Sequence, residues 1–163
     1  MSKKPPFPPK PRTIVLAIFP DFQILDVTGP LAAFEIAAHF APGAYRVKVA
    51  ASTPGLVRSS SGIALPAEPL KGQARIDTLM VSGGYGTRAA MSDRTLIDAL
   101  KRAPQRVRRV SSVCSGAFLL AQAGLLEGKR ATTHWRRAPQ LQQLFPNVRV
   151  GPDRIHVQDG DVW

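Results

Sequence analysis

Short apolar runs alternate along this chain with segments of helical spacing, and this alternation constrains the fold more than any other feature. Residues 13–19 and 76–81 are short runs of β-branched and aliphatic side chains bounded by turn residues, which is typical of buried strands. Between them, Leu31, Phe34 and Ala38 recur at three- or four-residue spacing, which predicts an amphipathic helix. Strands buried on both faces are typical of a parallel sheet covered by helices, so the sequence predicts an α/β fold.

The remaining segments continue this pattern. Further strands are predicted at 45–51 and 107–113, further helices at 93–102, 115–126 and 136–144, and short extended segments at 58–65, 148–150 and 154–158. Pro30 is acceptable in the first turn of the first helix. Because ligand sites in open α/β sheets lie at the carboxyl ends of the strands, the loops at 20–29, 82–87 and 114–116 are the candidate site segments.

Composition and charge bound the domain organisation. The chain has 163 residues, 44% of them hydrophobic and 20% charged, enough for one core, and we expect one domain over 13–163. Residues 1–12 are basic and dense in proline, which predicts a disordered tail. The net charge of +11 permits a nucleic-acid partner, but the basic clusters at 1–12, 101–109 and 129–137 come with no recognition-helix pattern. Solvated loops and helix ends are therefore the favoured interpretation of these clusters.

Targeting signals and cysteine content point to one compartment. No apolar run is long enough to cross a bilayer, and prolines follow the basic start where a signal peptide needs an apolar stretch. A single cysteine cannot form an internal disulfide, which fits a reducing compartment. We expect a cytoplasmic protein with no membrane partner.

That cysteine, Cys114, carries the sharpest chemical signal in the sequence. It lies between an apolar strand and a helix, with Ser112 two residues before it and Gly116 two residues after it, the small flanking residues that a nucleophile elbow requires. A thiol at a helix N-terminus is stabilised as the thiolate, so this position predicts a lowered pKa. The alternative is a buried structural cysteine at a strand end.

Two residues elsewhere are candidates to assist this thiol. His134 can pair with it as a base or orienting group, or it is a hydrogen-bonded histidine beside Trp135. Asp26 lies in the first loop, where it is either a helix N-cap or a site carboxylate. His39 and His156 lack a comparable context, and we expect both to be structural or solvent-facing.

The glycine-rich loop at 82–87 has two interpretations. Residues 84–89 match the G-x-G-x-x-A dinucleotide fingerprint, but they do not follow the first strand, and no suitable acidic residue follows a later one, so we expect no cofactor. The favoured interpretation is that the N–H groups of Gly83 and Gly84 complete an oxyanion hole with that of Ser115. One cysteine and three scattered histidines do not predict a metal site.

Four motifs together resemble the ThiJ/PfpI superfamily, which is class I glutamine amidotransferase-like. In chain order they are Leu-Asp-Val-Thr-Gly-Pro at 25–30, Val-Ser-Gly-Gly at 81–84, Ser-Val-Cys-Ser-Gly-Ala-Phe-Leu-Leu at 112–120 and Ala-Thr-Thr-His-Trp at 131–135. The similarity runs from about residue 12 to residue 163. It implies a flavodoxin-like three-layer sandwich with a mainly parallel sheet and a homodimer. It also implies that Cys114 is the nucleophile, that Asp26 faces it, and that His134 lies near it.

Two branches of the superfamily share these motifs. One contains isocyanide hydratases, in which a cysteine thiolate attacks an isonitrile that is hydrated to an N-substituted formamide. The other contains GlxA-type regulators, in which this domain precedes an AraC-type helix-turn-helix domain. Residues 145–150 and 159–163 resemble the regulator branch, where a closing helix normally follows, so the resemblance implies a domain incomplete at its C-terminal end.

These features predict a sensor and dimerisation domain of an AraC-type transcriptional regulator. It would bind a small-molecule effector near Cys114, and DNA only through a C-terminal domain absent from this chain. The alternatives are a cysteine-dependent hydratase of the isocyanide hydratase type and a pseudoenzyme domain that only dimerises.

Overall fold

A six-stranded sheet forms the centre of the computed structural model, which describes residues 10–73 and 75–163. Its strand order is β3-β4-β2-β1-β5-β6. The strands are β1 (Arg12–Ile18), β2 (Tyr45–Ala51), β3 (Gly55–Arg58), β4 (Ala64–Pro69), β5 (Ile76–Val81) and β6 (Arg109–Ser112). All neighbours pair in parallel except β3, which pairs antiparallel with β4, so the predicted mainly parallel sheet is confirmed.

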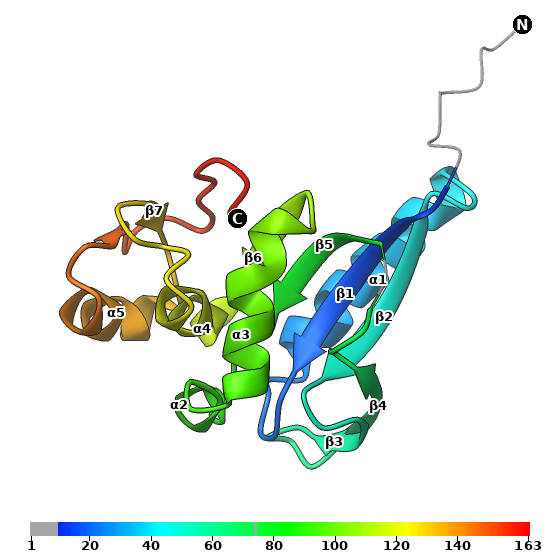
Figure 1. Ribbon diagram of the computed structural model, residues 1–163, viewed down its shortest axis with the longest axis horizontal. Coiled ribbons are helices and arrows are strands. Elements are labelled where there is room, and N and C mark those ends of the chain that lie inside the picture. The colour runs from blue at the N-terminus through cyan, green and yellow to red at the C-terminus, as the bar shows by residue number, and fades with distance from the viewer. Residues whose placement is uncertain (1–9, 74) are drawn as a thin grey trace, which may run out of the picture.

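Helices cover both faces of this sheet, which makes the fold a three-layer α/β sandwich. In Figure 1, α1 lies behind the strands and α3 lies in front of them. The helices are α1 (Leu25–Phe40), α2 (Thr87–Ala90), α3 (Arg94–Arg102), α4 (Ala117–Gln122) and α5 (Ala138–Leu144), with 3-10 turns η1 (Ala103–Gln105), η2 (Cys114–Gly116) and η3 (Trp135–Arg137). A separate parallel pair, β7 (Arg130–Ala131) and β8 (Arg149–Val150), lies near α5. No helix among the described residues is both long and apolar enough to span a membrane.

The core is built on the apolar runs that the sequence marks. Residues 14–18 of β1 are at most 2% exposed, because β1 has neighbouring strands on both edges and helices on both faces. The interior of α4 is equally buried, with Phe118 at 1% and Leu119 at 0%. The polar start of α3 is explained by Asp93, whose carboxylate accepts a hydrogen bond from the Leu96 N–H and caps the helix.

Helix α1 differs from its prediction in two respects. It begins at Leu25, so Pro30 lies inside the helix and the carbonyl of Asp26, four residues earlier, receives no N–H from it. It is also not amphipathic: only Val27 is buried, while Ile36 is 59% and Phe40 is 83% exposed. Apolar residues are spread around the helix instead of forming one stripe, and several of them are exposed.

Other boundaries also differ. The extended segment expected at 58–65 is a hairpin, because the chain turns between β3 and β4. The strand at 107–113 is shortened to β6, and the helix at 115–126 is shortened to η2 and α4 before a turn that contains Gly124. Residues 154–158 are not a strand. Of the predicted tail, 1–9 lie outside the described residues, and Arg12 already belongs to β1.

The last three residues of the chain join the outer edge of β6. Val162 forms a parallel bridge with Val110, and the Trp163 N–H donates to the Val110 carbonyl at 2.9 Å. The Ser112 N–H donates in turn to the Trp163 carbonyl at 3.0 Å, and the Arg109 guanidinium lies 4.5 Å from the centre of the Trp163 ring. The strand that leads to Cys114 is therefore hydrogen-bonded along both edges.

Candidate active site

Three loops at the carboxyl edge of the sheet bring the predicted site residues together. Asp26 follows β1, Gly83 and Gly84 follow β5, and Cys114 follows β6. The Gly83 N–H donates to Oδ2 of Asp26 at 2.9 Å, and the Cys114 thiol lies close enough to the same carboxyl to lower its pKa. Because β1, β5 and β6 are adjacent and parallel, their carboxyl ends meet at one place.

The backbone at Cys114 has the geometry of a nucleophile elbow. Its φ is 54°, a left-handed conformation that is strained for a residue with a side chain. Gly116 accommodates the turn, because a Cβ at that position would lie 2.6 Å from the Val81 carbonyl oxygen and 2.8 Å from that of Ser82. The elbow expected from the small flanking residues is therefore present.

The thiol of Cys114 differs electrostatically from its prediction. Burial raises its pKa, the charge of Asp26 raises it further, and the N–H and hydroxyl of Ser115 oppose these effects only in part. The expected lowering of the thiol pKa is therefore wrong. The physical reason is that Cys114 is partly buried and lies beside the carboxylate of Asp26, whereas the helical segment after it is only a 3-10 turn and a six-residue helix.

Asp26 does not cap a helix, and its carboxylate lies beside the elbow. It is the second residue of α1, whose N-cap position is taken by Ile24 with no side-chain hydrogen bond. Burial raises the pKa of Asp26, while the Gly83 N–H, the Cys114 thiol and the charge of His134 lower it by less. The thiol and the carboxyl thus each hold a proton more tightly than they do in water.

The two loop glycines serve close packing, and their N–H groups do not point at an open oxyanion site. The Gly83 N–H is taken by Asp26, and the Gly84 N–H donates to the Ser115 hydroxyl at 3.0 Å. Gly84 has a φ of 140°, and a Cβ there would lie 2.5 Å from the Asp21 carbonyl oxygen. This corrects the predicted oxyanion hole: the N–H of Ser115 faces the sulfur, but those of Gly83 and Gly84 hold other site residues in place.

A buried hydroxyl pair beneath the elbow is a feature that the sequence analysis missed. Thr87 and Ser115 are 1% and 5% exposed, and their hydroxyl oxygens lie 2.9 Å apart. The Thr87 hydroxyl also donates to the Gly84 carbonyl at 2.8 Å. The Ser115 hydroxyl also lies 3.4 Å from the Gly84 carbonyl oxygen, so its single proton has two oxygen acceptors, Thr87 and Gly84. No spacing rule connects these two residues, although a threonine that opens a helix after a glycine loop is a usable signal.

His134 lies at the site but is engaged elsewhere. Its Nδ1 accepts the Arg136 backbone N–H at 3.3 Å, and its ring stacks on Trp135 with centroids 5.8 Å apart. A nitrogen that accepts carries no proton, so the neutral ring holds its proton on Nε2. Thr133 ties this segment to the elbow, because its hydroxyl donates to the Cys114 carbonyl at 2.9 Å.

Two cavities border Cys114. The first, of about 300 Å³, is lined by Gln23, Ser60, Gly84, Tyr85, Cys114, Ser115, His134, Arg136 and Arg137. The second, of about 350 Å³, lies toward the C-terminal segment, and its lining includes His134, Trp163 and the exposed His156. Within 10–73 and 75–163, no group of three or more His, Cys, Asp and Glu side chains is arranged to hold a metal ion.

Comparison with known proteins places this site in a family. A family model described as DJ-1/PfpI family matches residues 12–162. An isonitrile hydratase from Pseudomonas putida is 34% identical over 90% of this chain, and the transcriptional regulator CdhR from Pseudomonas aeruginosa is 28% identical over 86%. The chain spans 61% and 42% of the lengths of these two relatives.

A solved structure agrees with the sequence relatives. The ThiJ/PfpI family protein from Pseudomonas syringae superposes with a TM-score of 0.81 at 26% identity, covering 98% of this chain and 67% of that one. The resemblance drawn from the four motifs and the fold that it implied are both confirmed. The chain belongs to the DJ-1/PfpI family.

Proposed function

We propose that this chain is the small-molecule sensor domain of an AraC-type regulator, with the 300 Å³ cavity at Cys114 as its effector site. The observation that carries the proposal is the internal use of the loop N–H groups. Thiolate acyl transfer needs free N–H donors directed at an oxyanion, whereas Gly83 and Gly84 donate to side chains of the protein. The raised pKa of Cys114 also keeps the resting thiol protonated. Such a site is better suited to binding than to turnover, and the similarity to CdhR supports a regulatory role.

A second candidate function is hydration of an isonitrile. The proximity of the Cys114 thiol to Asp26, through which each affects the pKa of the other, favours it, as does the isonitrile hydratase relative. In this reaction Sγ bonds to the terminal isonitrile carbon, and the thiol proton passes through Asp26 to that carbon, which gives a thioimidate. Water then adds to the same carbon and the C–S bond breaks. The products are an N-substituted formamide and the regenerated thiol.

One experiment separates the two functions. The purified chain is incubated with a small alkyl isonitrile, and the formamide is quantified by chromatography beside the Cys114→Ala and Asp26→Asn variants. The sensor proposal expects the same formamide level in all three proteins as in buffer. Formamide production that both variants abolish would overturn the sensor proposal in favour of the hydratase.

A second copy of this chain is the partner that we propose for α1. Leu25, Ile36 and Phe40 are exposed on a helix whose only charged residues are Asp26 and Glu35. Light scattering should give the mass of a dimer for the wild type and of a monomer for Ile36→Glu. A control substitution on α3, Lys101→Glu, should leave the dimer intact, and a monomeric wild type would contradict the proposal.

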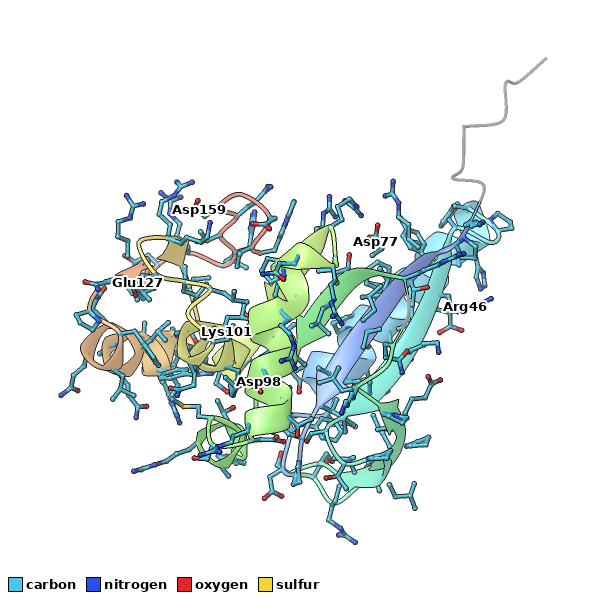
Figure 2. All side chains as sticks on the ribbon, in the orientation of Figure 1. Arg46, Asp77, Asp98, Lys101, Glu127 and Asp159 are labelled. Carbon is cyan, nitrogen blue, oxygen red and sulfur yellow. The ribbon has the colours of Figure 1, made fainter. Side chains whose placement is uncertain are left out.

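DNA contacts, in this proposal, are made by parts of the regulator outside these 163 residues. The labelled charged side chains lie on several elements: Asp98 and Lys101 on α3, Arg46 on β2, and Asp159 in the C-terminal segment (Figure 2). A mobility-shift assay should therefore find no sequence-specific binding by this chain at physiological salt. Binding that discriminates between sequences under those conditions would contradict this assignment.

A further inference from the structure

One arginine beside the elbow has a polar group that the protein does not satisfy. The Nε atom of Arg137 is buried and has no hydrogen-bond partner. Buried polar groups in folded proteins are almost always paired, and a charged donor left unpaired is especially costly. The protein therefore leaves the hydrogen bonding of this guanidinium incomplete, which distinguishes Arg137 as a candidate to bind a ligand.

The Arg137 side chain is held in place without an anionic partner. Its guanidinium carbon lies 5.4 Å from the centre of the Phe118 ring, a side chain that is 1% exposed. Among the described residues, the ion pairs involve other arginines and lysines, and Arg137 is in none of them. Stacking on an aromatic face fixes the plane of a guanidinium and leaves its N–H edges available.

The cavity that Arg137 borders has the charge of an anion site. Its lining also contains Arg136, whose guanidinium carbon lies 4.8 Å from the centre of the Trp135 ring, and it contains no Asp or Glu. Cys114 and Ser115 line the same cavity, and Gln23 and Ser60 add neutral polar groups. Two permanent positive charges therefore lie in one small cavity with the elbow cysteine.

We propose that Arg137 recognises the carboxylate of a small organic acid that binds in the Cys114 cavity. Because Nε is buried, the two Nη groups of Arg137 are the donors available to the cavity, and their N–H bonds form a planar fork that matches the two oxygens of a carboxylate. The rest of the ligand extends toward Cys114 and Ser115. This inference rests on the proposed function, because it names the chemical class of the effector or substrate of the same cavity.

Protection of Cys114 against iodoacetamide tests the inference. Butyrate is the carboxylate probe, butyramide is its neutral counterpart, and inorganic phosphate at equal ionic strength is the competing anion. We expect butyrate to slow alkylation of the wild type saturably and butyramide to have no effect. Loss of a charged hydrogen-bond pair should raise the half-protecting butyrate concentration about tenfold or more in Arg137→Met.

Two further variants make the test specific. Arg137→Lys keeps the positive charge but loses the fork, so we expect it to resemble Arg137→Met. Arg136→Met removes the neighbouring charge and should change the half-protecting concentration by only about twofold, since a surface charge contributes little. Thermal melts of each variant establish that the fold is intact.

The outcomes that overturn the inference differ from those that overturn the proposed function. Equal protection by phosphate and butyrate would show that the cavity binds anions in general. Equal losses of butyrate protection in Arg136→Met and Arg137→Met would show that the positive charge of both arginines, and not a specific bond to Arg137, attracts the ligand. Either result would overturn the inference. Normal alkylation with no protection would reject the carboxylate ligand and leave the cavity's proposed role standing. If iodoacetamide does not reach Cys114 at all, the cavity is closed and the proposed effector site is rejected. The carboxylate inference is then tested separately, by the change in melting temperature that butyrate causes in the wild type and in Arg137→Met.

Discussion

The two sides of the Cys114 elbow differ in how completely their polar groups are hydrogen-bonded within the protein. On the sheet side, Asp26, Gly83, Gly84 and Ser115 are hydrogen-bonded to one another, and Thr87 completes the network. On the side formed by 134–137, the side chains are exposed or only partly buried, and the buried Nε of Arg137 has no partner. In the proposed function this difference corresponds to two tasks: the sheet side positions the thiol, and the 134–137 side binds the ligand. Substitutions on the two sides should therefore affect different measurements.

The largest effect is expected at Gly116. Gly116→Ala places a Cβ against the backbone carbonyls of Val81 and Ser82, where nothing can move without shifting a strand end. We expect a loss of about 3 kcal/mol in the free energy of unfolding, measured by urea denaturation. Gly29→Ala in α1 is the matched control. Its Cβ would lie 3.9 Å from the Leu25 side chain, and it should be neutral or slightly stabilising.

A smaller loss of about 2 kcal/mol is expected for Thr87→Val, which removes two buried hydrogen bonds, one with the Ser115 hydroxyl and one to the Gly84 carbonyl. Thr87→Ser keeps the hydroxyl and should recover most of that stability. Since the Ser115 proton is then no longer shared with Thr87, Thr87→Val should also change the pH profile of Cys114 alkylation. Equal stability of the Val and Ser variants would show that the hydroxyl pair contributes nothing.

Asp26→Asn should have a modest effect whose size depends on pH. Burial raises the pKa of Asp26 above its unfolded value of about 3.9, so the folded state binds this proton more tightly than the unfolded state. The resulting stabilisation is complete below about pH 4 and is lost as the pH rises through the raised folded pKa. The variant escapes that loss and should gain about 1 kcal/mol or less relative to wild type between pH 4 and pH 7, because the side chain is only half-buried.

The same variant gives a second readout. The charge of Asp26 raises the pKa of Cys114, so its removal should shift the alkylation profile of the thiol to lower pH. A profile that stays in place or moves to higher pH would show that Asp26 does not raise the pKa of the thiol.

The smallest change in stability is expected for His134→Asn, on the 134–137 side. Because His134 is exposed, the free energy of unfolding should change by no more than about 0.5 kcal/mol. The charge of His134 lowers the pKa of Asp26, so the pKa of that carboxyl, followed by NMR titration, should rise slightly. A large loss of stability in His134→Asn would show that the 134–137 side contributes to folding as the sheet side does, which contradicts the comparison.

The sequence predicts the strands and the elbow of this molecule better than it predicts the pKa values and hydrogen bonds of the site. The strands β2 and β5 match their predicted bounds, and the elbow is recognisable from the small residues around Cys114, because both depend on local patterns. Burial and the charge of Asp26, which lies on α1, raise the pKa of the thiol, and the local sequence gives the wrong direction. The directions of the Gly83 and Gly84 N–H groups likewise depend on partners that only the folded chain brings near. The sequence therefore predicts the positions of helices and strands, but it does not predict which polar groups from distant parts of the chain become partners.

The pairing of residues 161–163 with β6 also protects the sheet against self-association. An edge strand with unpaired N–H and C=O groups is a template for strands of other molecules. Here the edge beyond β6 is occupied by Val162 and Trp163, and the opposite edge is β3, which has only four residues. Deleting 161–163 would uncover the Val110 and Ser112 N–H groups in a strand rich in buried residues. The expected consequence is aggregation at concentrations that the intact chain tolerates.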